Sequence, residues 1–404
     1  MINSKLNLYY QKLIKYPLFA LVILLPFNGL ISTFTRFELG ISNFWIYKDL
    51  LLAFIIICTV KYWAKYIHSK IAIVIILYLT LCIASIFWAP DSSLLRLVSG
   101  IKYSSLFLIS FVGGIVAYEH KIHDQLIKIM AWSGIMAVLI SLALHFGYGP
   151  TQFTNFGFRD DWSTHYAGEA PAFCQKIENQ NICRLQGVFS GPNQLGAYLI
   201  ILTGLCLMCI KNSKIVRAIL FSIGIVAVLT FSRSGILGLI LFYIIYLTPK
   251  LSKKMLMGVI VSFCLAGVLL VSLKPELFIR PESSFGHLSS FKNGIDFSLK
   301  SPLFGNGLAT AGSASNFFEN PVIPENWFLG IAGQLGIVGM ALFIAIYYLI
   351  CKNNFDQKQK ELFAISLGLL VPLMLLHSFE DSTVAYSFFL LQGMYFFNNS
   401  GRST

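Results

Sequence analysis

Apolar runs of about 20 residues recur along the whole chain, and most charged residues lie in the segments between them. A helix formed from such a run is long enough to cross the hydrocarbon core of a bilayer. Only 12% of the 404 residues are charged, whereas a soluble protein of this length carries about a quarter. This shortage indicates that lipid surrounds most of the chain. We therefore predict an all-α polytopic membrane protein in which residues 1–404 form a single membrane domain.

Reading mostly between charged positions gives twelve candidate transmembrane helices. They are 16–35, 40–60, 71–90, 103–118, 125–147, 187–210, 216–232, 234–249, 255–273, 327–351, 362–378 and 383–398. The first run lacks a clear small-residue cleavage site, so it is expected to be a span and not a signal peptide. The runs 216–232 and 234–249 are short and flank Arg233.

The basic residues predict the orientation. Alternate connections between the apolar runs are short and rich in lysine, as in the group Lys61, Lys65 and Lys70. The positive-inside rule then assigns these connections and both termini to the cytoplasm. The net charge of +12 arises largely in such loops, so it indicates membrane orientation and no nucleic-acid partner is expected.

Two long loops, about 148–186 and 274–325, are expected on the opposite side. Long loops in compact proteins tend to be functional. The first contains Cys174 and Cys183, which we expect to form a disulfide in an oxidising compartment. In the second, residues 286–300 could form an amphipathic helix that lies on the membrane.

Two arginines are candidates for binding an anion. Arg184 opens the stretch RLQGVFSGPNQLGAYL, in which Gly191-Pro192-Asn193 is a turn or helix-start signal. Arg233 lies in TFSRSGILG between two short uncharged runs, which place it near the outer interface. Each is either an interfacial anchor or a phosphate ligand, because the planar guanidinium fork suits phosphate oxygens.

The acidic and histidine candidates lie in PENWFLG and HSFEDS. Glu325 is either an acid at a helix N-terminus, favoured by the helix dipole, or a general base, and the neighbouring Asn326 could position a polar substrate. His377, Glu380 and Asp381 are either a solvated turn or a group that holds the arginines and the acceptor. No third or fourth ligand joins the His377–Glu380 pair, so no metal is expected.

Taken in order, the motifs RLQGVFSGPNQLGAYL, TFSRSG, SPLFGNGL and ENWFLGIAGQLGIVGMALF resemble those of the O-antigen ligase and polymerase superfamily (Wzy-type). The resemblance covers residues 180–345 by motif. It implies a glycosyltransferase-C-like (GT-C) fold in the bacterial inner membrane, with the active site facing the periplasm. It also implies undecaprenyl-diphosphate-linked glycans as donors, no metal and no other cofactor, and it assigns Arg184 and Arg233 to the diphosphate.

The chain departs from the ligase pattern at two places. Ligases of this family usually carry His-Asn where this chain has Glu325-Asn326, and they tend to carry arginine within the segment here occupied by residues 284–287. A carboxylate at position 325 resembles the polymerase branch more closely.

We therefore expect an O-antigen repeat-unit polymerase, which transfers the growing glycan from undecaprenyl diphosphate to the non-reducing end of an incoming lipid-linked repeat. Glu325, Arg184 and Arg233 are the expected catalytic residues. The expected substrate-binding residues are Asn193, Asn326, His377 and Glu380. The alternatives are an O-antigen ligase acting on lipid A core and a flippase for lipid-linked oligosaccharides. Besides its lipid substrates and membrane lipids, expected partners are a chain-length regulator and a flippase.

Overall fold

The architecture is described from a computed structural model. It describes residues 2–41, 47–90, 93–147, 150–159, 170–177, 180, 182–248, 252, 272, 280–318 and 321–397. Within these residues the regular structure is helical, and the only β interactions are two isolated bridges, Arg159–Ala172 and Lys176–Cys183. The predicted all-α class is therefore confirmed for the described residues. The predicted span 255–273 lies outside them, apart from residue 272.

Five helical segments are long and apolar enough to cross a membrane, and a bent pair provides a sixth. Three of the five are single helices: α7 (His123–Gly147), α8 (Pro192–Cys209) and α14 (Trp327–Asp356). The segment Lys12–Glu38 contains most of α1 (Ile2–Leu24), all of α2 (Asn28–Thr33) and the short helical turns beside α2. The segment Lys70–Phe87 contains α4 (Lys70–Ala84) and a short turn. The bent pair is α5 (Leu94–Ser104) and α6 (Leu108–Glu119), which meet at 53°. All six overlap predicted spans.

Five further helices coincide with predicted spans but do not meet this criterion for spanning. They are α3 (Tyr47–Tyr66), α9 (Ser213–Leu229), α10 (Arg233–Leu247), α15 (Lys360–Leu375) and α16 (Ser382–Phe396). The last four contain only 17, 15, 16 and 15 residues, which is less than the roughly 20 that a perpendicular span needs. The helices of a membrane protein are present, but neither twelve spans nor a GT-C arrangement is confirmed.

The centre of the molecule is built around α16 packed against α6. A Cβ atom on Gly114 would lie 2.1 Å from the carbonyl oxygen of Leu390, and one on Gly393 would lie 2.0 Å from that of Phe111. The two helix backbones therefore touch, which small residues permit in membrane interfaces. Tyr386 and Phe388 on α16 are almost fully buried beside this contact.

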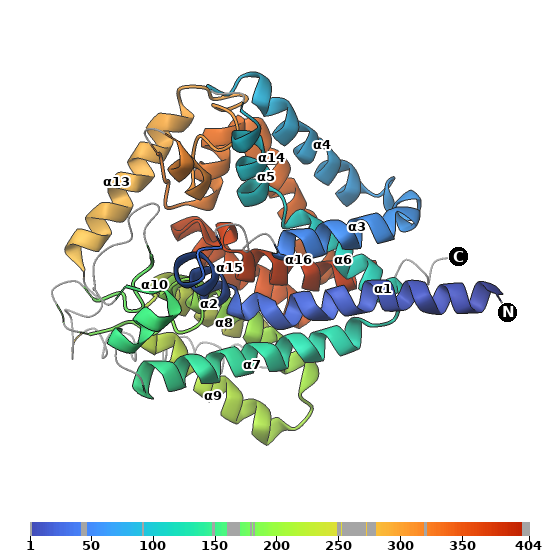
Figure 1. The fold of residues 1–404 in the computed structure, drawn as a ribbon, viewed down its shortest axis with the longest axis horizontal. Coiled ribbons are helices and arrows are strands. Elements are labelled where there is room, and N and C mark those ends of the chain that lie inside the picture. The colour runs from blue at the N-terminus through green and yellow to red at the C-terminus, as the bar shows by residue number, and fades with distance from the viewer. Residues whose placement is uncertain are drawn as a thin grey trace.

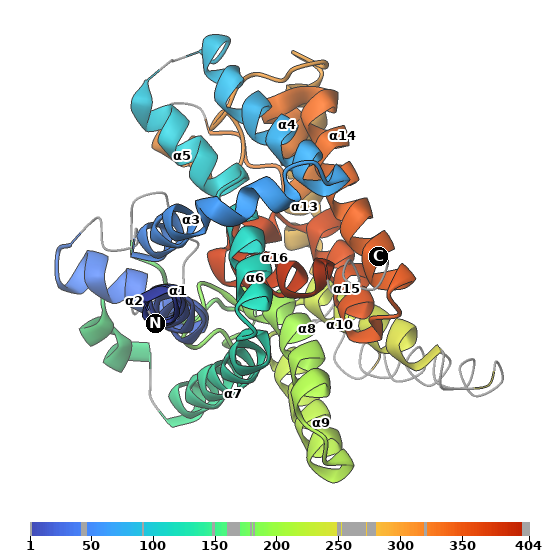
Figure 2. The same ribbon diagram turned by 90° about the vertical axis from the view of Figure 1, so that its right-hand side faces the viewer.

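Helix α13 (Pro281–Ser298) lies in the second long loop, close to the helix expected at 286–300. It forms one end of the molecule, at the left in Figure 1, opposite the N-terminal end of α1. Figure 2 shows the same elements from the side. Phe297 of α13 packs against Gly333 of α14, and Gly294 lies against Pro324. These contacts hold α13 against the first turns of α14.

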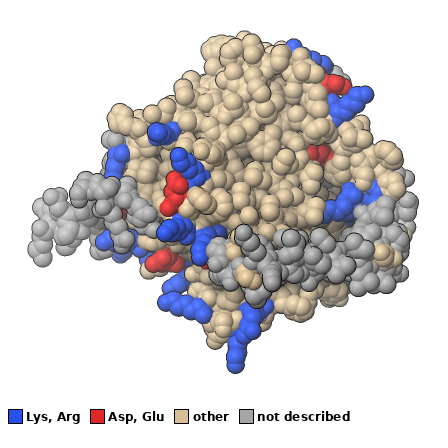
Figure 3. Space-filling view, turned by 180° about the vertical axis from the view of Figure 1, so that it is seen from behind, with Lys and Arg blue, Asp and Glu red and all other residues tan. Residues whose placement is uncertain are grey.

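The charges of the face drawn in Figure 3 are unevenly spread. Lysine and arginine side chains lie mostly toward the two sides of the view, and uncharged surface occupies most of the middle. The helices of the molecule expose large apolar side chains, including Trp132 and Leu139 of α7 and Ile337 of α14. An uncharged zone between charged ends is what a membrane-embedded surface requires.

Candidate active site

The site is built around the tight turn of residues 230–233 that joins α9 to α10. Phe231 adopts the left-handed region with φ 49°. The Oγ of Ser232 caps α10 by accepting a hydrogen bond from the N–H of Gly235 at 3.3 Å. The carbonyl oxygens of Thr230 and Phe231 each accept a hydrogen bond from an arginine of another segment. The turn therefore serves as a common anchor for distant cationic side chains.

Arg184 reaches the turn from the loop before α8. It is buried, with 8% exposure, and its Nε donates to the carbonyl oxygen of Thr230 at 3.0 Å. Its Nη2 donates to Oδ1 of Asn193 at 2.7 Å. Asn193, which is expected to bind substrate, holds Arg184 through its carbonyl oxygen. A buried side chain with this role is not the snorkelling anchor that was the alternative interpretation.

Arg280 approaches the same turn from the residue before α13. It is also buried, with 7% exposure, and its Nη2 donates to the carbonyl oxygen of Phe231 at 2.8 Å. Arg280 is not among the residues selected from the sequence. A signal was present, because Pro281 directly after it is typical of the first residue of a helix, and this identifies Arg280 as the residue entering α13.

Arg233, the first residue of α10, points toward α13. Its Nη1 donates to Oγ of Ser284 at 3.0 Å and its Nη2 donates to Oγ of Ser283 at 3.4 Å. Arg280, Ser284 and His287 are four and three residues apart, so they lie on one face of the helix. This face of α13 meets the arginine turn.

The three arginines repel one another electrostatically. Burial and then the charges of Arg280 and Arg233 lower the pKa of the Arg184 guanidinium to about 9. This value still leaves Arg184 protonated at neutral pH. The mutual repulsion would be relieved by an anion bound among the three side chains, and guanidinium groups suit the oxygens of phosphate or diphosphate.

His287 and Glu325 face each other beside the arginines. Nδ1 of His287 contacts Oε2 of Glu325, and the two side chains are 35% and 30% exposed. Burial and then the positive charges of Arg233, Arg280 and Arg184 lower the pKa of His287. Burial and the arginines thus favour the neutral imidazole, which can accept a proton. In the sequence, position 287 stands out only as part of a departure from the ligase pattern.

Asn326 performs the capping role that was one interpretation of Glu325. Its Oδ1 accepts from the N–H of Leu329 at 2.9 Å at the start of α14, and its Nδ2 donates to the carbonyl oxygen of Met374 at 2.6 Å. Both ends of the amide are thus engaged within the protein. Glu325 precedes the cap residue, so its carboxylate remains available for His287 and a substrate.

The HSFEDS segment is packed into the protein, so the interpretation as a solvated turn is wrong. Glu380 is 6% exposed at its side chain, its Oε2 accepts from the N–H of Ser313 at 2.9 Å, and it lies 3.9 Å from Nε2 of His377. Asp381 caps α16 by accepting from the N–H of Val384 at 3.2 Å, and burial raises its carboxyl pKa.

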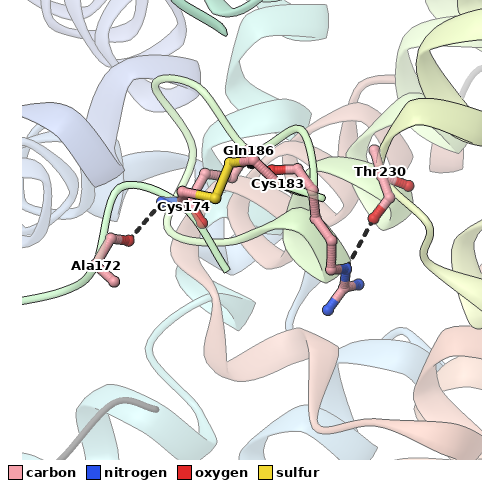
Figure 4. Close-up of a disulfide and its surroundings, with 6 residues drawn as sticks. Ala172, Cys174, Cys183, Gln186 and Thr230 are labelled. Carbon is pink, nitrogen blue, oxygen red and sulfur yellow. Dashed lines mark hydrogen bonds between the residues drawn. A yellow bond between two sulfur atoms is a disulfide. The ribbon is translucent and has the colours of Figure 1, made fainter. Parts of the chain in front are cut away.

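Cys174 and Cys183 are joined by a disulfide, and Arg184 is the next residue in the chain. The N–H of Arg184 donates to the carbonyl oxygen of Gln175 within the closed loop at 3.0 Å. Nearby, Nε2 of Gln186 donates to the carbonyl oxygen of Ala172 at 3.0 Å (Figure 4). The disulfide therefore holds the backbone that presents Arg184 to Thr230.

Among the residues that the structure describes, no group of three or more histidine, cysteine or acidic residues is placed to hold a metal ion. The groups at this site with evident chemistry are the arginines, which can bind an anion, and the His287–Glu325 pair, which can accept a proton.

These features indicate a membrane protein, helical in the residues that the structure describes, with an arginine cluster and a histidine–carboxylate pair at one end. Residues 218–344 match the family model described as O-antigen ligase (Wzy_C), and this match supports the O-antigen ligase and polymerase superfamily that the motifs predict. Members of the family are membrane glycosyltransferase-like enzymes. The matched residues include Arg233, Arg280, His287 and Glu325, whereas Arg184 lies outside them. A search of curated proteins finds no match.

Proposed function

We propose that the protein is a repeat-unit polymerase for O-antigen or a similar surface polysaccharide. The donor is the growing glycan on undecaprenyl diphosphate, and the acceptor is the non-reducing sugar of an incoming lipid-linked repeat. The observation that carries the proposal is the convergence of Arg184, Arg233 and Arg280 on one turn beside the His287–Glu325 pair. The site combines an anion receptor with a proton acceptor.

The arginines act on the leaving group. In the transfer, the bond between the anomeric carbon and the diphosphate oxygen breaks, and negative charge accumulates on the departing diphosphate. Cationic donors that are already in position stabilise this charge as it develops in the transition state. One such donor contributes about 10²–10³-fold to the rate. Arg184 and Arg280 are held by backbone carbonyls, which keeps them in position without the substrate.

The His287–Glu325 pair acts on the acceptor. A sugar hydroxyl is a poor nucleophile, and a positioned base contributes about 10²–10⁴-fold. The hydroxyl oxygen attacks the anomeric carbon and its proton passes to the pair. With Nδ1 of His287 turned to Glu325, the Nε2 of the neutral imidazole is the atom that accepts the proton, and Glu325 positions the ring. The products are the extended lipid-linked glycan and undecaprenyl diphosphate.

An O-antigen ligase is the second candidate, and one observation favours it. The sequence lacks the histidine that ligases carry at position 325, but the fold brings His287 from α13 to the side chain at that position. A histidine is therefore present in the site from a different segment. The ligase would use the same donor and would transfer the glycan to lipid A core.

Gene deletion followed by electrophoresis of lipopolysaccharide distinguishes the two functions. Loss of a polymerase leaves a band with a single repeat attached to core. Loss of a ligase leaves bare core while polymer accumulates on the lipid carrier. A normal ladder in the deletion strain would contradict both. In either function the enzyme lies in the bacterial inner membrane with this site toward the periplasm, where a chain-length regulator and a flippase would be its protein partners.

A further inference from the structure

An apolar groove runs between α9 and α10. It has a volume of about 550 Å³, and its lining includes Leu220, Phe221, Gly224, Val228, Leu229 and Tyr243. Phe221 is 73% exposed and Ile225 is 47% exposed along it. In a membrane protein such an opening faces hydrocarbon chains.

The groove reaches to within one residue of the 230–233 turn that the arginines bind. Leu229, which lines it, is the last residue of α9, and the next residue is Thr230, whose carbonyl oxygen is held by Arg184. From Leu229 to Leu220 the helix descends nine residues, which is about 14 Å at 1.5 Å per residue. This length corresponds to roughly one leaflet of the hydrocarbon core.

We propose that this groove holds the polyprenyl chain of the lipid diphosphate whose head group the three arginines bind. The inference rests on the proposed function, because it deepens the assignment of the donor. A groove that ends one residue before the turn held by Arg184 and Arg280 suits a lipid whose diphosphate is attached directly to its hydrocarbon chain. The arginines bind the charge, and the groove then selects the long chain attached to it.

Gly224 offers a direct way to fill the groove. A Cβ atom built at this position meets no other atom within 4 Å outside its own stretch of helix, and Gly224 lines the groove, so a larger side chain there extends from open space into the groove. Ser222 provides a matched control, because it is exposed on the same helix and does not line the groove. Gly224→Trp and Ser222→Trp therefore add the same side chain two residues apart.

The test measures equilibrium binding of two probes to the purified full chain in phospholipid nanodiscs. The probes are undecaprenyl diphosphate, with the long chain, and geranyl diphosphate, with the same head group and a short chain. Gly224→Trp should weaken undecaprenyl diphosphate binding by about tenfold or more, because it removes contacts of several buried methylene groups. It should leave geranyl diphosphate binding unchanged, and Ser222→Trp should alter neither.

An unchanged affinity of Gly224→Trp for undecaprenyl diphosphate overturns the proposal and would mean that ordinary phospholipid fills the groove. Equal weakening of both probes also overturns it, because the effect would then lie in the head-group site. The binding assay requires no sugar transfer. If the long probe binds as expected while the deletion strain makes a normal ladder, the proposed function fails and the groove assignment stands.

Discussion

At the scale of single residues, the site brings positively charged side chains together in a largely buried position. Arg184 and Arg280 are both buried, and each donates one hydrogen bond to a backbone carbonyl of the 230–233 turn. Burying charges of one sign is unfavourable unless a partner neutralises them. An anionic substrate bound among the arginines would reduce their mutual repulsion.

Replacing the arginines by lysine should abolish most activity. Arg184→Lys and Arg280→Lys keep one positive charge but lose the planar fork that binds a backbone carbonyl and a phosphate oxygen together. We expect each to lower turnover by about 10²-fold, measured as polymer formed at equal protein level. Lys300→Arg, just beyond the C-terminal end of α13, serves as a control. Full-length polymer from either lysine variant would remove the argument for a diphosphate clamp.

The His287–Glu325 pair should determine the dependence of the rate on pH. Since burial and the arginines lower the pKa of His287, its proton-accepting form should predominate down to a pH below about 6.5, the ordinary value for histidine. The rate should rise with pH through this lowered pKa and should be level at neutral pH. A rate profile measured on purified enzyme would show its acidic limb below about pH 6.5.

Glu325→Gln provides the matching substitution, because it preserves size and removes the charge. It should reduce polymer formation by about 10²–10⁴-fold while donor binding is largely retained, and Glu325→Asp should keep partial activity. Glu361→Gln, at the start of α15, is the control. A normal ladder from the Gln variant would contradict the role of Glu325 in positioning His287 for proton transfer.

At the scale of elements, the loop closed by the disulfide fixes the backbone position of Arg184. Removing the bridge by Cys174→Ser with Cys183→Ser should lower the free energy of unfolding by about 2–3 kcal/mol, because a short closed loop no longer restricts the unfolded chain. Thermal unfolding in detergent measures this. Reductant should destabilise the wild type by a similar amount and should not affect the double variant. Free labelling of both thiols in intact periplasm would contradict the bridge.

Helix α14 contains a second element-scale feature, a kink at Gly336. This residue has φ 66° and ψ −170°, a region that is essentially restricted to glycine. A Cβ atom there would lie 2.2 Å from the carbonyl oxygen of Leu303, so the kink makes room for the loop after α13. At Gly330, on the same helix, an added Cβ atom would have no other atom within 4 Å.

These two glycines form a matched pair for a stability measurement. Gly336→Ala should destabilise the fold by at least about 1–3 kcal/mol, the range for a strained backbone conformation. Gly330→Ala should be neutral or slightly stabilising, because alanine favours helix more than glycine does. Melting temperatures of the two variants in the same detergent give the comparison. Equal melting temperatures would show that the loop relaxes around the added methyl group.

At the scale of the whole molecule, the orientation in the membrane remains a prediction from loop charge. Lysine-rich connections alternate with poorer ones, and the arginine site belongs to the opposite end of the helices. Reporter fusions at Lys253 and Asn179 should report the cytoplasm and the periplasm, respectively. An outward signal from the first position or an inward signal from the second would contradict the orientation and would place the site on the cytoplasmic side.

The helices, and several residues of the candidate site, could be predicted from the sequence. In lipid every backbone polar group must be satisfied within its own helix, so a long apolar run is a strong local signal, and all six spanning elements overlap predicted runs. Arg184, Arg233 and Glu325 were also accessible, because each lies in a recognisable motif at the border of a run. The disulfide was predicted from the two cysteines of one polar loop.

Which side chains meet in the site could not be predicted from the sequence, because it depends on how distant segments pack. Arg280 and His287 belong to the start of α13, and their positions beside Arg184 and Glu325 depend on how that helix packs on α14. The structure also decided that Asn193 and Asn326 hold other protein groups, and that Glu380 is buried. These contacts join segments far apart along the chain, and local patterns of hydrophobicity and charge carry no information about such pairings.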